Sequence, residues 1–275
     1  MLRAFILTSL FLFTFLIPVT NVAAQSPQVI KLERFRKALW KVHVSVKGKE
    51  GDFLFDTGGG ITLLAEEFAK GVDCKFWGRF TGYNMFGKKG GGPYCSDVQL
   101  QSRGVALTPV NVGRMSFEGM FPGDKAPDGL LSLDSFDGKV ITIDQKAATL
   151  TIETDKSLKK RVRTMKEFPL RISRECSGRC LSAFLGVKTP DGMTWLNLDT
   201  GAGGVSLISK EYAASFGLGP EERGQELNFT LDSSIKISSP VMVTDMIMDG
   251  NLGQPFLANY VITLDLKQGR AWLGN

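Results

Sequence analysis

The sequence predicts an all-β protein built from two copies of one structural unit. Three observations predict it: apolar segments are short and frequent, helical patterns are few, and four landmarks recur in the same order in both halves. The 275 residues are long enough for two compact units of about 100–150 residues, each with its own core. We therefore expect two duplicated, β-barrel-like lobes with a few short helices.

The main landmark is an apolar strand that ends in Asp, Thr and Gly. Asp56-Thr57-Gly58 follows one such strand, and Asp199-Thr200-Gly201 follows the other. Before each lies a second apolar strand, joined to the first by a turn at 49–51 or at 189–192, which predicts a hairpin. Because a charge at the end of a buried strand is costly unless it is hydrogen-bonded, both aspartates need a structural or chemical reason.

Two further landmarks complete the repeat. Apolar residues at helical spacing follow each Asp-Thr-Gly segment, over 61–69 and 205–213. Later, Gly129-Leu130-Leu131 and Gly250-Asn251-Leu252 each precede a Val-Ile-Thr strand by the same number of residues. The chain is therefore an internal duplication.

The N-terminus predicts export. Residues 1–24 combine a basic start, an apolar run and a small-residue cleavage site, which is the pattern of a signal peptide. The alternative, a membrane anchor, would need about 20 apolar residues, and the run is shorter. We expect a first lobe over 25–155, a linker over 156–166 and a second lobe over 167–275, in a periplasmic or extracellular protein without stable membrane insertion.

Four cysteines suit that compartment. The simplest pairing joins Cys74 to Cys95 and Cys176 to Cys180. The alternative, a zinc site made of the four thiolates, lacks the paired short spacings that such sites use.

The net charge excludes few classes of function. The net charge is +5, and the densest basic run, 156–163, falls between the two repeats. A solvated linker is the preferred interpretation, and a nucleic-acid or membrane patch is the alternative. Because no aromatic ladder accompanies the run, we expect no nucleic-acid partner.

Several catalytic classes are excluded. His43 is the only histidine, and it lies in the middle of an alternating strand, so a Ser-His-Asp or Cys-His hydrolase would depend on it alone. The sequence holds no HExxH zinc motif, no phosphate-binding loop with Lys and a hydroxyl, and no dinucleotide fingerprint after a strand.

After these exclusions, one carboxylate in each repeat remains as a candidate catalytic group. If the units pack about a pseudo-two-fold axis, Asp56 and Asp199 face each other and share a proton, because two carboxyls in contact cannot both ionise. One could then take a proton from a bound water while the other, protonated, polarises a carbonyl. No metal or cofactor is required. The glycines allow backbone N–H groups to approach, and Thr57 and Thr200 supply hydroxyls that can join the two loops.

The paired Asp-Thr-Gly hairpins, each followed by an apolar-apolar-Gly-like segment, resemble the aspartic proteases: the two-lobed pepsin type, with lobes reduced toward the retropepsin-like unit. The resemblance implies a bilobed acid-protease fold and a peptide or protein substrate, and a monomer would suffice because one chain carries both acids. It implies these roles: catalytic Asp56 and Asp199, supporting Thr57, Thr200, Gly58 and Gly201. The sequence departs from the family at Gly59, Ala202, Ser132 and Asn251.

The glycine-rich segment 76–93 is either a lid over a cleft or a plain loop. If it is a lid, Tyr83 is the candidate flap residue and Tyr94 a weaker one.

The leading hypothesis is an exported aspartic endopeptidase that hydrolyses peptide bonds with a water activated between two carboxyls. The alternative is a secreted peptide-binding or inhibitory protein of the same fold without catalysis. In a third interpretation both aspartates only cap turns, which predicts that the two carboxyls lie far apart.

Overall fold

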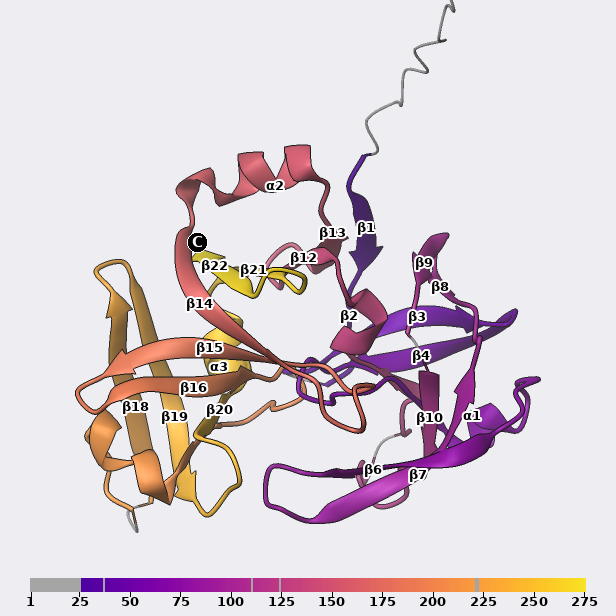
Figure 1. Ribbon diagram of the computed structural model, residues 1–275, viewed down its shortest axis with the longest axis horizontal. Helices are drawn as coiled ribbons and strands as arrows, with labels where there is room; N and C mark the ends of the chain where they lie inside the picture. Colours follow the sequence, from indigo (N-terminus) through magenta and orange to yellow (C-terminus); the bar gives the residue numbers. More distant parts are fainter. Residues whose placement is uncertain (1–25, 37, 110, 124, 221–222) are drawn as a thin grey trace, which may run out of the picture.

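The structure, a computed structural model, describes residues 26–36, 38–109, 111–123, 125–220 and 223–275 (Figure 1). Strands dominate the described residues and the helices are short, so the predicted all-β class is confirmed. The predicted signal peptide lies outside the described residues. No helix in the described part of the chain is long and apolar enough to cross a membrane.

The first half of the chain contributes two short helices, α1 (Glu66–Ala69) and the 3-10 helix η1 (Leu133–Phe136). Its strands are β1 (Gln28–Lys31), β2 (Glu33–Arg34), β3 (Trp40–Val46), β4 (Lys49–Phe55), β5 (Leu63–Ala65), β6 (Trp77–Tyr83), β7 (Lys89–Ser96), β8 (Leu100–Ser102), β9 (Val105–Leu107), β10 (Asn111–Met115), β11 (Gly129–Leu131), β12 (Val140–Asp144) and β13 (Thr149–Ile152).

The second half begins with α2 (Asp155–Arg161) and the 3-10 helix η2 (Val162–Thr164). The elements that follow are β14 (Lys166–Ser173), β15 (Ser182–Thr189), β16 (Gly192–Leu198), β17 (Ser206–Ser209), η3 (Lys210–Tyr212), η4 (Ala214–Phe216), β18 (Gln225–Asp232), β19 (Ile235–Thr244), β20 (Gly250–Leu252), α3 (Gln254–Leu257), β21 (Val261–Asp265) and β22 (Arg270–Gly274).

The strands form two sheets. One has ten strands in the order β6-β7-β10-β5-β11-β4-β3-β8-β9, with β2 paired to β3 outside this path. The other has twelve, in the order β1-β13-β12-β21-β22-β14-β15-β16-β20-β17-β19-β18. Its first six strands come from both halves and lie between the two lobes in Figure 1. The expected lobe boundaries at 155 and 167 remain a prediction.

A pseudo-two-fold axis passes between β12 and β21. These equivalent strands of the two repeats pair antiparallel, with Thr142 opposite Thr263, and the two hydroxyl oxygens lie 2.8 Å apart. Outside this central pair, β13 corresponds to β22 and β1 corresponds to β14. The duplication seen in the sequence is therefore also a spatial symmetry.

Both predicted hairpins form, but one turn lies elsewhere. The β3–β4 turn is at Lys47 and Gly48, where φ is 48° and 85°, and not at 49–51. Two successive left-handed residues match the right-handed twist of a hairpin, which explains why the chain turns there. The expected helices over 61–69 and 205–213 are also partly wrong. Residues 63–65 and 206–209 form the strands β5 and β17 instead, because pairing with β11 and β20 outweighs local helical periodicity.

Both expected disulfides are present, Cys74–Cys95 and Cys176–Cys180, so the zinc alternative is wrong. The second disulfide closes a short loop that crosses to the first lobe. There Leu181 N–H donates to the carbonyl of Gly60 at 2.7 Å, and Cys180 joins a buried apolar cluster of the first lobe. This loop therefore links the second lobe to the segment that follows Asp56.

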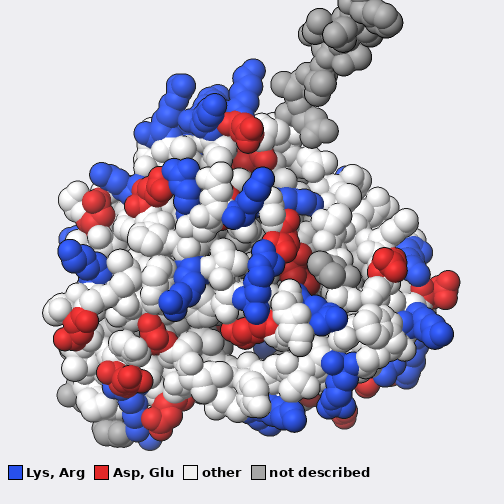
Figure 2. All heavy atoms as spheres, in the orientation of Figure 1, with Lys and Arg blue, Asp and Glu red and all other residues white. Residues whose placement is uncertain are grey.

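The basic run between the repeats forms most of α2 and continues into η2. Thr154 caps the N-terminus of α2 in a capping box with Ser157, and its last turn is basic, which suits the negative end of a helix dipole. Figure 2 shows Lys and Arg side chains gathered over this helix, at the top of the molecule. The hairpin β6–β7 lies at the opposite end in Figure 1.

A buried carboxyl lies behind the Asp56 loop. Asp134 is 4% exposed and accepts hydrogen bonds from Thr62 N at 3.0 Å and from Thr62 Oγ1 at 2.6 Å. Burial disfavours the charged form and raises the pKa of Asp134 to about 7, although the hydrogen bonds from Thr62 act in the opposite direction.

Asp134→Asn should flatten the pH dependence of stability. The pKa of Asp134 is raised in the folded state, so its contribution to stability is fully present below about pH 4 and is lost as pH rises through about 7. An amide does not titrate, so the urea midpoint of the variant should change less over this range than that of the wild type. Asp73→Asn, at an exposed position, is the control. Parallel curves for the wild type and Asp134→Asn would contradict the assignment.

Candidate functional site

The two aspartates lie at equivalent strand ends. Asp56 follows β4 and Asp199 follows β16, and each strand pairs in parallel with β11 or β20. The N–H of Asp56 donates to the carbonyl of Leu131 at 3.0 Å, and that of Asp199 donates to the carbonyl of Leu252 at 3.0 Å. The two segments that recur later in each repeat therefore support the two Asp loops.

The structure brings the two carboxyls together. They interact with each other through a hydrogen bond and through their charges. A Cβ added to Gly58 would lie 2.4 Å from the carboxyl carbon of Asp199, and one added to Gly201 would lie 2.5 Å from that of Asp56. Each loop glycine is thus covered by the carboxyl of the other lobe. The interpretation in which both acids merely cap distant turns is wrong.

The threonines join the two loops. Thr57 Oγ1 donates to the carbonyl of Leu198 at 2.5 Å, and Thr200 Oγ1 donates to the carbonyl of Phe55 at 2.9 Å. Each hydroxyl also accepts the backbone N–H of the other threonine at 3.0 Å. Both side chains are 1% exposed. These four reciprocal hydrogen bonds fix the distance between the two carboxyls.

The electrostatics of the pair favour one proton. Burial, followed by the negative charge of Asp199 and the hydrogen bond to it, raises the pKa of Asp56 well above its usual value. Hydrogen bonds from the N–H groups of Gly58 and Gly59 only partly oppose this shift. Two carboxyls in contact disfavour ionisation of both, so the arrangement can hold a single proton between them.

The glycine-rich segment 76–93 forms the hairpin β6–β7, and its tip reaches the second lobe. Ile247 N–H donates to the carbonyl of Met85 at 3.0 Å, and Met85 Sδ lies 3.8 Å from Asn251 Nδ2. Tyr83 lies in the same hairpin and is 60% exposed, so its role as flap residue stays a prediction. Tyr94 is buried in β7, away from the tip. The contact made by Met85 could not be found from the sequence, because it depends on how the hairpin crosses the molecule.

A pocket of about 280 Å³ opens beside Asp56. Apart from Asp56 and Gly201, from the two Asp loops, and Arg36, the residues that line it are apolar: Leu39, Leu54, Phe117, Met120, Phe121, Pro127 and Leu130. Its size and lining suit one apolar side chain. The pocket draws on segments that are far apart in the sequence, and no local motif marks it.

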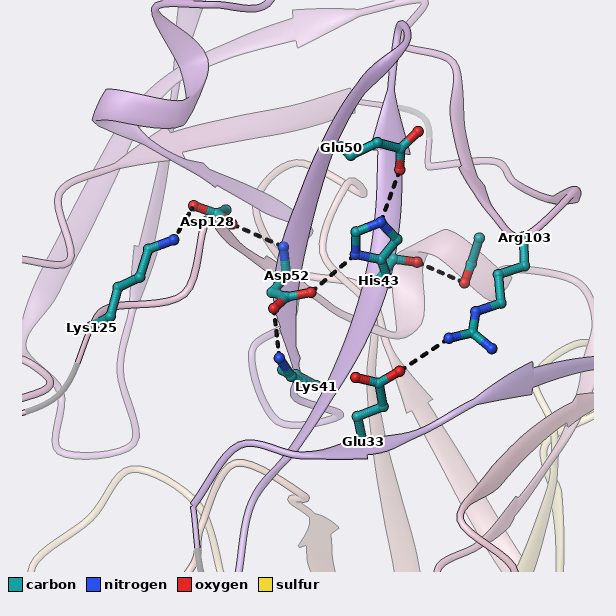
Figure 3. A network of polar contacts seen from close by, with 9 residues as sticks. Glu33, Lys41, His43, Glu50, Asp52, Arg103, Lys125 and Asp128 are labelled. Carbon is teal, nitrogen blue, oxygen red and sulfur yellow. Dashed lines mark hydrogen bonds and ion pairs between the residues drawn. The ribbon is translucent and has the colours of Figure 1, made fainter.

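The only histidine lies outside this site. His43 lies on β3, with Nδ1 3.0 Å from Asp52 Oδ1 and Nε2 3.2 Å from Glu50 Oε2; both carboxylates point toward the imidazole ring (Figure 3). Ser102 Oγ donates to the backbone carbonyl of His43 at 2.8 Å and not to its imidazole, so among the described residues this serine and histidine do not form a catalytic pair. Among the described residues, no three His, Cys, Asp or Glu side chains are arranged to hold a metal ion.

Comparison with known proteins shows a shared fold. No family model matches the sequence, and no curated protein is similar to it in sequence. Basic 7S globulin from soybean is similar in structure, with a TM-score of 0.60 at 11% identity, over 90% of this chain and 94% of that chain. Conglutin gamma, a basic 7S globulin from lupine seeds, has a TM-score of 0.55 at 11% identity, over the same shares. At this identity the similarity establishes the fold alone.

These comparisons correct the family expected from the sequence. The assignment to the pepsin-type and retropepsin-like aspartic proteases is wrong: no family model matches, and the similar structures are globulins, whose names denote no protease. The physical reason is that the residues behind the resemblance also close the fold. Thr57, Thr200 and the loop glycines join the two lobes, whether or not any bond is cut. The comparisons thus place the chain in a bilobed β fold, and fold does not imply activity.

Proposed function

We propose that this protein binds an extended peptide segment over the Asp56–Asp199 pair. One observation carries the proposal: the tip of β6–β7 reaches Asn251, the residue that donates to Asp199, and is held there through its main chain, from Ile247 N–H to the carbonyl of Met85 at 3.0 Å. Main-chain hydrogen bonds combined with side-chain pockets are how proteins hold extended peptides. The pocket beside Asp56 would receive one apolar side chain of the ligand.

Exposed apolar side chains support the same proposal. Tyr83 and Phe86 on the hairpin are 60% and 52% exposed, and Ile247 on the facing loop is 62% exposed. Large apolar side chains that cluster in the open mark binding surfaces. One chain supplies both acids and both sides of the site, so a monomer would suffice. The two disulfides support an exported protein, because such bonds persist in oxidising compartments.

Hydrolysis of the bound peptide is the second candidate, and the paired carboxyls favour it. The ionised carboxyl would take a proton from water as the water oxygen bonds to the peptide carbonyl carbon, and the neutral carboxyl would give its proton to the carbonyl oxygen. The C–N bond then breaks. The amine nitrogen takes the first proton, and a hydroxyl of the intermediate returns the second, which regenerates the pair. Binding without cleavage takes first place because the similar structures are globulins.

Asp56→Asn separates the two candidates. The purified protein and the variant are titrated with fluorescent peptides that carry one large apolar residue, and cleavage is followed by mass spectrometry at several acidic pH values. The peptide Kd should change by less than about tenfold, because main-chain bonds and the pocket remain. Any cleavage by the wild type should fall by at least about a hundredfold. Absence of peptide binding by both proteins would contradict the proposed function, whereas binding without cleavage by the wild type would remove only the second candidate.

Met85→Ala should strengthen peptide binding. A ligand in this site competes with the hairpin tip, so weakening the contact of Met85 with Asn251 raises the population of the open state and lowers the apparent Kd by a few-fold. Isothermal titration with the same peptides measures the change. Lys88→Ala, an exposed position on the same turn, should leave the Kd unchanged. Weaker binding by Met85→Ala would show instead that Met85 contacts the ligand.

A further inference from the structure

One position breaks the symmetry of the site next to the carboxyls. Leu130 in β11 and Asn251 in β20 are equivalent residues of the two repeats, each between Gly and Leu in a strand that supports an Asp loop. Leu130 lines the apolar pocket that opens beside Asp56. Asn251 is fully buried, and its Nδ2 donates to Asp199 Oδ2 at 2.7 Å. One acid therefore has an apolar neighbour where the other has an amide donor.

The hydrogen bonds of the two acids differ accordingly. Asp199 Oδ1 accepts the N–H groups of Gly201 at 2.7 Å and Ala202 at 3.1 Å, and its Oδ2 accepts Asn251. Both oxygens of Asp199 are thus acceptors, which favours the ionised form. Asp56 accepts the N–H of Gly58, at 2.9 Å on Oδ1, and also that of Gly59, so the backbone donors of the two acids match. The difference is that the amide corresponding to Asn251 is replaced by Leu130.

We propose that Asn251 is a positioning residue that keeps the single proton of the pair on Asp56 and leaves Asp199 ionised. Asp56 then donates the hydrogen bond between the two carboxyls. The raised pKa of Asp56 agrees with this placement. The titratable group that faces Asp199 is Asp56, and the one cation among the described residues that line the adjacent pocket is Arg36, on the Asp56 side. Arg36 would favour ionised Asp56, so it acts against the proton placement and does not produce it.

The cost of this amide supports a specific role. Within the described residues, Asn251 Oδ1 is buried without a hydrogen-bond partner. An unpaired buried acceptor destabilises a protein, and a leucine at this position, as in the first repeat, would avoid the cost. If the side-chain amide of Asn251 were rotated by half a turn, Oδ1 would face Asp199. It would then find a hydrogen-bond donor only if Asp199 carried the proton. The orientation of this one amide is therefore coupled to the location of the proton.

As far as it concerns hydrolysis, the inference rests on the proposed function, and it assigns a catalytic role to each of the two acids. Asp199 would take the proton from water, and Asp56 would give its proton to the carbonyl oxygen. The placement of the proton itself does not depend on catalysis, and it can be measured in a protein that cuts nothing.

The test is the protonation state of each carboxyl. Carboxyl carbon chemical shifts of Asp56 and Asp199, assigned with Asp56→Asn and Asp199→Asn, are followed by NMR over about pH 3 to 8 in the whole protein. Where the pair holds one proton, the wild type should show a neutral Asp56 and an ionised Asp199. A neutral Asp199 in the wild type would overturn the proposal without any further variant.

Asn251→Leu should move the proton. Loss of one hydrogen bond to a charged group should lower the ratio of proton on Asp56 to proton on Asp199 by about tenfold or more. Asn197→Leu is the matched control, because Asn197 is also buried and lies opposite Asn251 on the adjacent strand β16. An unchanged ratio in Asn251→Leu, or an equal change in both variants, would overturn the role of Asn251. If the wild type cleaves no peptide, the carboxyl shifts still decide the placement, and only the proposed hydrolysis fails.

Discussion

The structure depends on the reciprocal hydrogen bonds of Thr57 and Thr200 across the pseudo-two-fold axis. Each hydroxyl is buried, donates to a backbone carbonyl of the other lobe and accepts the N–H of the other threonine. Since buried polar groups must be paired, neither loop can move without leaving a donor or an acceptor unsatisfied. The close approach that results leaves no room for a side chain at Gly58 or Gly201. The contact between the two carboxyls is a consequence of this constraint.

The same constraint explains why the resemblance to aspartic proteases is misleading. In a chain that closes two duplicated lobes through such loops, closure by itself is a sufficient reason for threonine and glycine at these positions. The catalytic meaning of the site then rests on the two acids and on what surrounds them. The soybean and lupine globulins show that the architecture extends to proteins whose names denote no protease. The chemical properties of the site therefore depend on the two aspartates themselves and on the differences between their surroundings in the two repeats.

Much of the architecture could be predicted, because local patterns in the sequence encode it. The duplication, the Asp loops and both disulfides follow from repeats, spacing and cysteine count. The helices expected over 61–69 and 205–213 were partly wrong because strand pairing outweighed periodicity. The contact of Met85 with Asn251 and the pocket beside Asp56 could not be predicted, since both depend on segments that are distant in the sequence. Asn251 was visible as a polar residue in an apolar segment, but its partner became identifiable only in three dimensions.

Function in a duplicated fold requires that the symmetry be broken near the site. A symmetric pair of acids gives no reason for the proton to sit on either one, and a symmetric cleft cannot distinguish the two directions of a peptide. Here the first lobe supplies a hairpin whose tip contacts Ile247 and Asn251 of the second lobe, and the second lobe supplies the Cys176–Cys180 loop, where Leu181 binds back to Gly60. Leu130 and Asn251 make the corresponding distinction between the two carboxyls. The symmetric residues thus hold the lobes together, and the proposed peptide binding and proton placement both depend on the asymmetric ones.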